Sequence, residues 1–311
     1  MKKVLGVDIG GTDIKLGIVS AEGETVESGK IPTLAGEGPR QAVERVAVWL
    51  GERGDGHHGV AAAGIGCAGL VDASRGYLYY SPNLPGWADL DLCGLFAGAL
   101  DLPVTVDNDA NCAAWGEYVH GAGRGTRFFV CITLGTGVGG GVVTDGRLYR
   151  GCQGLAGEIG HQVIDPSGPE CSCGTAGCLE AMANASSIVS RVRAAIAAGT
   201  GSVLDGGESL TPRDVAAAAA EGDVVAIEAL AAAGRALGTG LANIVHLFDP
   251  EVIAIGGGVA GAGDLILEPA RESMHGQLMA DTYAGVKVVP AELGNMASLV
   301  GSSMMALGKR D

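Results

Sequence analysis

The sequence KVLGVDIGGTDIKLGIVS, residues 3–20, decides the fold of this chain. Its two apolar runs flank the turn Gly10-Gly11-Thr12, and this pattern predicts two β-strands joined by a tight turn. The same order of strand, glycine turn and strand returns in FFVCITLGTGVGGGVVT, residues 128–144. We interpret this return as a weak internal duplication.

The remaining sequence predicts alternating strands and helices, which indicates an α/β architecture. Segment 81–87, SPNLPGW, is expected to be irregular because its prolines and glycine oppose regular structure. The restart near residue 120 predicts a small lobe at 1–119, on which a terminal helix at about 297–311 packs, and a large lobe at 120–296. We expect strands at 3–9, 14–20, 24–31, 60–66, 104–107, 128–134, 140–144, 251–255 and 286–290, and helices at 39–53, 110–119, 179–198, 212–221, 224–247, 264–279 and 297–308.

The composition is that of a globular protein, because 47% of the 311 residues are hydrophobic and 18% are charged. The formal net charge of −15 argues against binding to nucleic acid or to a membrane, since both present negative charge. The N-terminus lacks the long apolar segment of a signal peptide, and the longest apolar stretch, near 60–71, is too short to span a bilayer. We therefore expect a cytoplasmic protein.

Three glycine turns predict a site for phosphate groups. Glycine lets phosphate oxygens approach the backbone and permits the positive φ angles of an anion-binding nest. The turns at 8–12 and 134–140 each add a threonine hydroxyl, and Asp8 supplies a carboxylate suited to Mg²⁺. The turn at 255–259 lies between a strand and a helix and suits the nucleoside. The alternative is that all three are ordinary tight turns. A dinucleotide site is excluded at 135–140, because a strand and not a helix follows its G-x-G-x-x-G pattern.

The segment VDNDAN, residues 106–111, lies where a buried strand gives way to a helix. Asp109 there is a candidate general base, because a carboxylate at a helix N-terminus is kept ionised by the helix dipole. Asn108 beside it is a candidate for orienting a sugar. The alternative is that Asp109 is only the N-cap of helix 110–119.

His161, Cys171, Cys173 and Cys178 provide the four ligands of a tetrahedral structural zinc site in the large lobe. A disulfide is the alternative, and the absence of an export signal argues against it. Glu158 and Glu180 flank the cluster and are candidates for accepting hydrogen bonds from vicinal sugar hydroxyls. The alternative for these two residues is solvated surface charge.

As a set, these residues resemble the ROK family of sugar kinases, and within it the bacterial glucokinases. The resemblance implies a two-lobed actin-like ATPase (ribonuclease H-like) fold with an interdomain cleft, assembled as a homodimer or homotetramer. It implies ATP with Mg²⁺ as cofactors, a structural Zn²⁺, and phosphorylation of a hexose, glucose in preference, at its 6-hydroxyl. The motifs that carry it are DIGGTDIK at 8–15, VDNDANCAAWGE at 106–117, LGTGVGGG at 134–141, EIGH at 158–161, CSCGTAGCLE at 171–180 and IGGGV at 255–259.

The resemblance also assigns roles to matching positions. Asp109 would be the catalytic base. The sugar would be bound by Asn83, Asn108, Asp109, Glu158, His161 and Glu180, and zinc by His161, Cys171, Cys173 and Cys178. The nucleotide would be bound by Asp8, Gly10, Gly11, Thr12, Lys15, Gly135, Thr136, Gly137, Gly256, Gly257 and Gly258. This chain departs from the family at Asp107, where glutamate is frequent, at Ala68, where proline is frequent, and at Asp13, an acid beside the first turn.

The substrate itself stays open within the family. N-acetylglucosamine, N-acetylmannosamine, mannose or fructose could replace glucose, and polyphosphate could replace ATP. ROK repressors carry a DNA-binding helix-turn-helix before the DxGGT strand, which here begins at residue 3. A non-catalytic sugar sensor is expected to lack Asp109, which is present.

Overall fold

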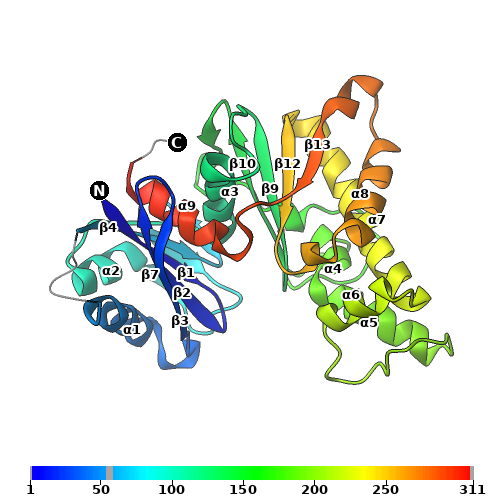
Figure 1. The fold of residues 1–311 in the computed structure, drawn as a ribbon, viewed down its shortest axis with the longest axis horizontal. Helices are drawn as coiled ribbons and strands as arrows, with labels where there is room; N and C mark the ends of the chain where they lie inside the picture. The colour runs from blue at the N-terminus through cyan, green and yellow to red at the C-terminus, as the bar shows by residue number, and fades with distance from the viewer. Residues whose placement is uncertain (1, 54–58, 309–311) are drawn as a thin grey trace. The chain divides into compact units, whose positions relative to one another are not determined.

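The computed structural model describes residues 2–53 and 59–308, and the chain divides into two compact units. Unit 1 contains Met1–Arg127, Gly141–Gly157 and Leu293–Asp311, and unit 2 contains Phe128–Gly140 and Glu158–Glu292. The sequence interpretation drew one boundary near residue 120, whereas contacts return Gly141–Gly157 to unit 1. The order of strands and helices confirms the α/β architecture (Figure 1).

Unit 1 is built on a five-stranded sheet in the order β3-β2-β1-β4-β8. β1 pairs antiparallel with β2, and it pairs in parallel with β4, which pairs in parallel with β8. The five strands confirm the predicted ones to within one residue at each end. They are β1 Lys3–Ile9, β2 Asp13–Ser20, β3 Thr25–Pro32, β4 Val60–Cys67 and β8 Val104–Asn108.

Among its described residues, unit 1 also contains the α-helices α1 Pro39–Gly51, α2 Leu92–Leu100, α3 Asp109–His120 and α9 Ala297–Ala306. α9 is buried almost throughout and packs against α3, β1 and β4. A glycine at 301 makes this possible, because a Cβ there would collide with the backbone carbonyl of Cys112 on α3. The predicted terminal helix therefore forms, although its expected residues 309–311 lie outside the described residues.

The sequence did not predict a second, small sheet in unit 1. It consists of β5 Leu70–Asp72, β6 Tyr77–Tyr80 and β7 Ala88–Asp91, paired antiparallel in that order. Strands of three or four residues are too short to show a clear alternation of apolar and polar residues. The loop at 81–87 between β6 and β7 is irregular, as predicted.

The second five-stranded sheet follows the order β11-β10-β9-β12-β13. β12 runs parallel to both β9 and β13, and β10 and β11 form a short antiparallel hairpin. Like the first sheet, it begins with strand, glycine turn and strand, consistent with the interpretation of a duplication. The strands are β9 Phe129–Leu134, β10 Val138–Thr144, β11 Arg147–Leu148, β12 Val252–Gly256 and β13 Lys287–Pro290.

The helices of unit 2 surround α7 Val224–Phe248, which packs against α4, α5, α6 and α8. α7 is long enough to span a membrane, and an 18-residue window within it has a mean hydropathy of 1.4. However, 61% of that window is buried within the protein, as in the core helix of a globular domain. The predicted helix 179–198 is wrong as one element, because the backbone is extended at Asn184, whose side chain caps the second half. The other helices are α4 Leu179–Ala183, α5 Ala185–Ala197, α6 Pro212–Ala220 and α8 Asp264–His275.

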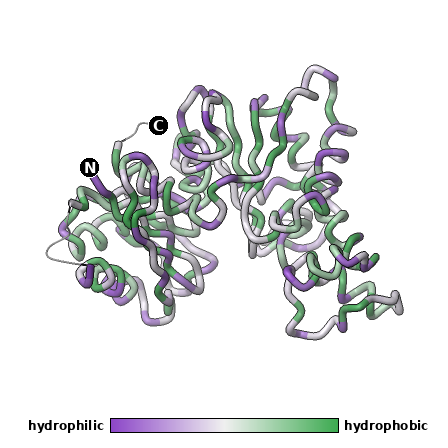
Figure 2. The backbone as a smooth tube through the Cα atoms, in the orientation of Figure 1, coloured by the Kyte–Doolittle hydropathy of each residue, from purple (hydrophilic) through white to green (hydrophobic). Residues whose placement is uncertain are grey.

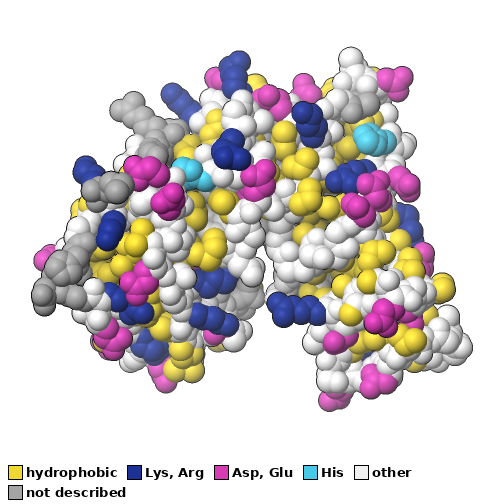
Figure 3. Space-filling view, viewed as in Figure 1, with side chains coloured by type: hydrophobic (Ala, Val, Ile, Leu, Met, Phe, Trp, Pro, Cys, Tyr) yellow, Lys and Arg dark blue, Asp and Glu magenta, His cyan; other side chains and the backbone are white. Residues whose placement is uncertain are grey.

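Apolar residues are frequent along the strands of the two five-stranded sheets, and polar residues are more frequent on the helices farther from these sheets (Figure 2). On the face seen in Figure 3, basic side chains are interspersed with acidic ones and form no continuous basic surface.

Candidate functional site

In unit 1, parallel strands β1, β4 and β8 end at the same edge of the sheet. The register pairs Asp8 with Gly66 and Gly66 with Asp107, so the two aspartates lie two strand spacings apart, about 10 Å. A Cβ at Gly66 would lie 2.8 Å from the Ser298 hydroxyl and 3.5 Å from the Asp109 Cα atom. Glycine at 66 therefore lets the first turns of α9 and α3 meet the sheet between the carboxylates.

Asp8 is held by two side chains from different elements. Lys15 Nζ lies 3.0 Å from its Oδ2 atom, and the Ser298 hydroxyl donates a hydrogen bond of 3.0 Å to its Oδ1 atom. The structure thus brings together Asp8 and Lys15, both of which the sequence assigned to the nucleotide. The contribution of Ser298 was missed, because nothing in the sequence links residue 298 to residue 8.

The first glycine turn lies against the loop that carries Asn83. A Cβ at Gly11 would lie 2.8 Å from the Asn83 backbone oxygen, so Gly11 is required by close approach of this loop. Two predicted site residues are therefore neighbours. The expected positive φ is wrong for this turn, because neither Gly10 nor Gly11 has one.

Asn108, and not Asp109, is the N-cap of α3. Asn108 Oδ1 accepts hydrogen bonds from the backbone N–H groups of Ala110 (2.8 Å) and Asn111 (3.1 Å), and its Nδ2 donates to the Gly69 carbonyl (3.0 Å). The prediction that Asp109 caps the helix is wrong by one residue. The sequence does not distinguish the two positions, because asparagine and aspartate both cap helices well. Asp109 is instead the first helical residue, half-buried, and its carboxylate lies at the positive end of the helix dipole.

In unit 2, the second glycine turn is held by Glu180 of α4. Glu180 Oε2 accepts a hydrogen bond of 3.0 Å from the Val138 N–H, and a Cβ at Gly137 would lie 2.5 Å from the same oxygen. The turn is closed by a hydrogen bond of 2.9 Å from the Gly135 N–H to the Gly137 carbonyl. Gly135 and Gly137 also lack positive φ, so Gly137 is glycine because a carboxylate occupies the space of its side chain.

The short 3₁₀ helix Ile159–His161 lies against the start of β10. A Cβ at Gly160 would collide with the Val138 carbonyl, so glycine is required at this contact. His161 Nε2 lies 4.0 Å from a carboxylate oxygen of Glu158. Partial burial raises the pKa of Glu158, with a further contribution from the Glu180 carboxylate, while His161 lowers it. The three predicted sugar-binding residues of unit 2 therefore lie close to one another.

His161, Cys171, Cys173 and Cys178 converge as predicted, with one candidate ligand atom from each lying within 4.8 Å of every other. The Cys173 and Cys178 sulfurs are 3.7 Å apart, and the Cys171 sulfur is 3.7 Å from His161 Nδ1. Ligand atoms of a tetrahedral zinc ion are separated by about 3.5–3.8 Å, given bond lengths near 2.0–2.3 Å. The residues therefore fit a zinc ion, and all three thiols are free of disulfides.

The backbone shapes the cysteine loop for this role. Gly174 and Gly177 have positive φ of 88° and 75°, and the Gly174 N–H donates to the Cys171 carbonyl. The Thr175 N–H lowers the pKa of Cys173 to about 7, which favours the thiolate form that binds metals. Burial raises the pKa of Cys178 to about 12, and a metal ion bound to this sulfur would favour its thiolate form.

The third glycine turn follows β12 and contacts the second. Gly257 has a positive φ of 88°, and a Cβ there would collide with the backbone of Leu134. Gly258 lines a cavity of about 290 Å³, whereas Gly256 and Gly257 do not. The sequence missed the other side of this cavity, whose only local signal is the start of α6 at Pro212. It is lined also by Ile188, Pro212, Arg213, Ala216, Leu230, Val259, Gly261 and Ala262.

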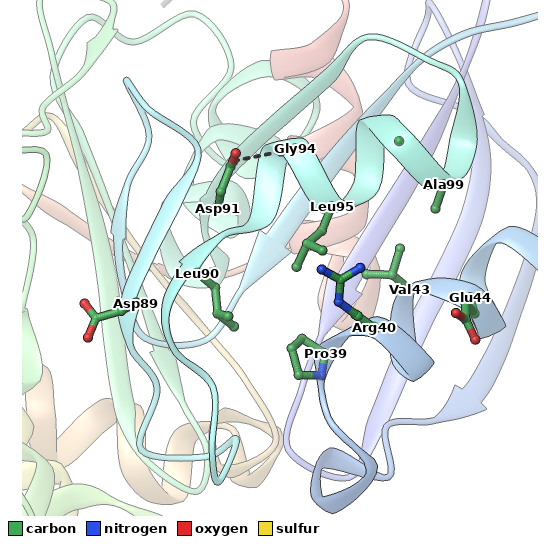
Figure 4. Close-up of a pocket in the computed structure, with 11 residues that line it drawn as sticks. Pro39, Arg40, Val43, Glu44, Asp89, Leu90, Asp91, Gly94, Leu95 and Ala99 are labelled. Atoms are coloured by element: carbon green, nitrogen blue, oxygen red, sulfur yellow. Dashed lines mark hydrogen bonds between the residues drawn. The ribbon is translucent and has the colours of Figure 1, made fainter.

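A larger cavity of about 740 Å³ lies in unit 1 between α1, β7 and α2 (Figure 4). None of the predicted site residues lines it. Its charged side chains are Arg40 and the carboxylates of Glu44, Asp89 and Asp91. The Asp91 carboxylate accepts a hydrogen bond from the Gly94 N–H. An excess of carboxylates does not suit the phosphates of a nucleotide, so size alone does not identify the site.

Comparison with known proteins places these features in a family. A model described as the ROK family matches residues 4–309. The glucokinase of Streptomyces coelicolor is 39% identical, over 98% of each chain, and the glucokinase of Thermotoga maritima is 36% identical, over 97% of this chain and 96% of the relative.

The fold agrees with a solved structure described as a ROK family glucokinase from Streptomyces griseus in complex with glucose and AMPPNP. That structure has a TM-score of 0.86 and 37% identity, over 98% of this chain and 99% of the other. The predicted actin-like ATPase fold is thereby confirmed. The chain belongs to the ROK family.

Proposed function

We propose that this protein is an ATP-dependent sugar kinase that transfers a phosphoryl group to the 6-hydroxyl of glucose. Similarity along almost the whole chain to glucokinases supports the reaction, and the structure in complex with glucose and AMPPNP supports both substrates. The observation that carries the proposal is Asp109, a half-buried carboxylate at the first position of α3 whose capping role is taken by Asn108. A sensor without catalysis does not need this carboxylate.

Asp109 acts as the general base and accepts the proton of the sugar hydroxyl as its oxygen attacks the γ-phosphorus. Asn108 uses one of its two amide hydrogens for the Gly69 carbonyl, which leaves the second for a sugar oxygen. Asn83, which lies against Gly11, adds a further sugar contact.

Glu158, His161 and Glu180 bind the sugar hydroxyls. Glu180 Oε1 accepts a hydrogen bond from the Ser172 hydroxyl and also lies 3.7 Å from the Cys171 sulfur. Its Oε2 accepts from the Val138 N–H and keeps a lone pair that can accept from a sugar. The His161 ring has two functional edges, because Nδ1 faces Cys171 and Nε2 faces Glu158. One edge would bind zinc and the other a sugar hydroxyl.

The nucleotide is held largely by backbone groups, as a chain of net charge −15 requires. Two turns face its phosphates. One contains Gly10, Gly11 and Thr12, and the other contains Gly135, Thr136 and Gly137. Asp8 and Lys15 would hold Mg²⁺ and a phosphate oxygen, and Mg²⁺ when bound neutralises the charge that develops on the phosphates. The turn at Gly256, Gly257 and Gly258, with the cavity of about 290 Å³ beside it, receives the nucleoside.

The zinc ion would be held by His161, Cys171, Cys173 and Cys178 and would act as a structural element. It would fix the loop that carries Ser172 and leads into Glu180, so that the sugar-binding carboxylate has a defined position. We further propose a cytoplasmic location and a homodimer or homotetramer, without nucleic-acid or membrane partners.

The experiment that tests this function is a coupled ADP-release assay with the purified protein. The panel contains glucose, mannose, fructose, N-acetylglucosamine and N-acetylmannosamine as acceptors. Polyphosphate is tested separately as the donor, by direct detection of the sugar phosphate. The highest kcat/KM is expected for glucose with ATP. A higher value for another sugar would change the substrate, and binding of glucose without turnover would make the protein a sugar sensor.

A further inference from the structure

A buried ion pair lies directly beside the proposed base. Asp107 precedes Asn108 at the end of β8 and is only 1% exposed, and its Oδ2 atom is 2.8 Å from Nε of Arg150. Arg150 follows β11, more than forty residues along the chain, and belongs to the same unit. A buried carboxylate requires such a partner, because removal from water disfavours its charge.

The other oxygen of Asp107 is tied to the first turn of α3. Oδ1 accepts hydrogen bonds from the Asn108 N–H (2.8 Å) and from the Asn111 side-chain amide (3.0 Å). Asp109 lies between these two residues. The carboxylate of Asp107 therefore holds the backbone N–H of the residue before Asp109 and the side chain of Asn111, two residues after it, while Arg150 fixes the rotamer of Asp107.

We propose that Arg150 and Asp107 are positioning residues that set the place of the Asp109 carboxylate for proton transfer. The inference rests on the proposed kinase function and goes beyond it, since neither residue would touch the sugar or the nucleotide. The physical basis is that a catalytic group displaced by about 1 Å can lose about 10²-fold in rate.

The alternative is that the pair only stabilises unit 1, like other ion pairs. Arg53 provides a matched control, because its side chain is 24% exposed, as is that of Arg150, and it pairs with Glu27 in the same unit. Glu27 is 45% exposed, so the control pair has no buried carboxylate, and Glu27 lies on β3, at the opposite end of the sheet order from β8. A purely structural role predicts that both substitutions change stability and that neither changes the turnover of the folded protein.

The test compares Arg150→Met, Asp107→Asn and the double variant with Arg53→Met. The double variant avoids the unpaired buried carboxylate that Arg150→Met alone would leave. We expect kcat to fall about 10²-fold in all three, with glucose affinity by titration calorimetry unchanged. The double variant should be no slower than the worse single variant, since the two residues act as a unit. Arg53→Met should keep the wild-type kcat.

A second readout does not depend on activity. Asn108 caps the N–H groups of Ala110 and Asn111, so loss of the pair should speed hydrogen exchange at these two amides, and Arg53→Met should not. Unchanged exchange, or a kcat within twofold of the Arg53→Met value, would overturn the inference. If the wild type phosphorylates no sugar, the proposed function fails, and the exchange rates still decide whether the pair positions this turn.

Discussion

Asp109→Asn separates the contribution of Asp109 to catalysis from its contribution to stability. Asparagine has the shape of aspartate and can still accept the N–H of Ala110, which Asp109 accepts at 2.9 Å. The cap of α3 is untouched, because Asn108 supplies it. Only the negative charge and the proton acceptor are lost.

The two losses differ greatly in magnitude. Loss of a general base lowers kcat by about 10²–10⁴, which corresponds to about 2.7–5.4 kcal/mol of transition-state stabilisation. Loss of one carboxylate at the helix dipole costs about 0.3–1 kcal/mol, which lowers Tm by at most about 4 °C in a chain of this size. Activity should therefore nearly disappear while the protein remains folded.

The assay measures ADP release at saturating glucose and ATP, together with Tm and glucose binding. Asp264→Asn is the matched control, because Asp264 is the first residue of α8, a helix of 12 residues like α3. The control should lose the same interaction with a helix dipole and keep full activity. A kcat of Asp109→Asn within threefold of the wild type would refute the assignment of the base.

Three further outcomes follow from the same contacts. Asn108→Ala should lower the free energy of unfolding by about 1–2 kcal/mol, measured by urea titration, since it removes the cap that Asp109→Asn preserves; equal stability of the two variants would contradict the cap assignment. Elemental analysis should give about one zinc per chain. Cys173→Ser should lower the zinc content and Tm, whereas Cys152→Ser, at an exposed cysteine outside the cluster, should change neither. A preparation without zinc at full stability would disprove the metal site. Gly137→Ala should weaken glucose binding, because its Cβ would displace Glu180. Gly36→Ala, where an added Cβ meets nothing within 4 Å, should bind glucose normally. Equal affinities would show that the Glu180 contact does not matter for the sugar.

Much of the fold could be predicted because apolar runs bounded by glycine are strong local signals. The strands of the first sheet agreed to within one residue. The cluster of His161, Cys171, Cys173 and Cys178 was predicted because three cysteines within eight residues are rare by chance. Where two residues satisfy the same local rule, sequence does not decide between them. Asn108 and Asp109 both cap helices, and only the folded backbone shows which one does.

Other features depend on contacts between distant parts of the chain. The break at Asn184 interrupts no apolar pattern, so 179–198 looked like one helix. The positive φ expected at Gly11 and Gly137 is wrong, and atoms of Asn83 and Glu180 instead occupy the space that their side chains would need. Arg150 and Ser298 belong to no sequence motif. Only the folded structure shows that Arg150 lies beside Asp107 and Ser298 beside Asp8.

The most direct test of the central claim is the identification of the product. The purified protein is incubated with ATP, Mg²⁺ and glucose, and the mixture is followed by phosphorus NMR with Asp109→Asn in parallel. The account predicts that ATP is converted to ADP and that an equal amount of a monoester appears whose phosphorus couples to the two protons on carbon 6 of the sugar. Release of inorganic phosphate in place of the ester, a phosphate on another carbon, or equal product from Asp109→Asn would contradict it.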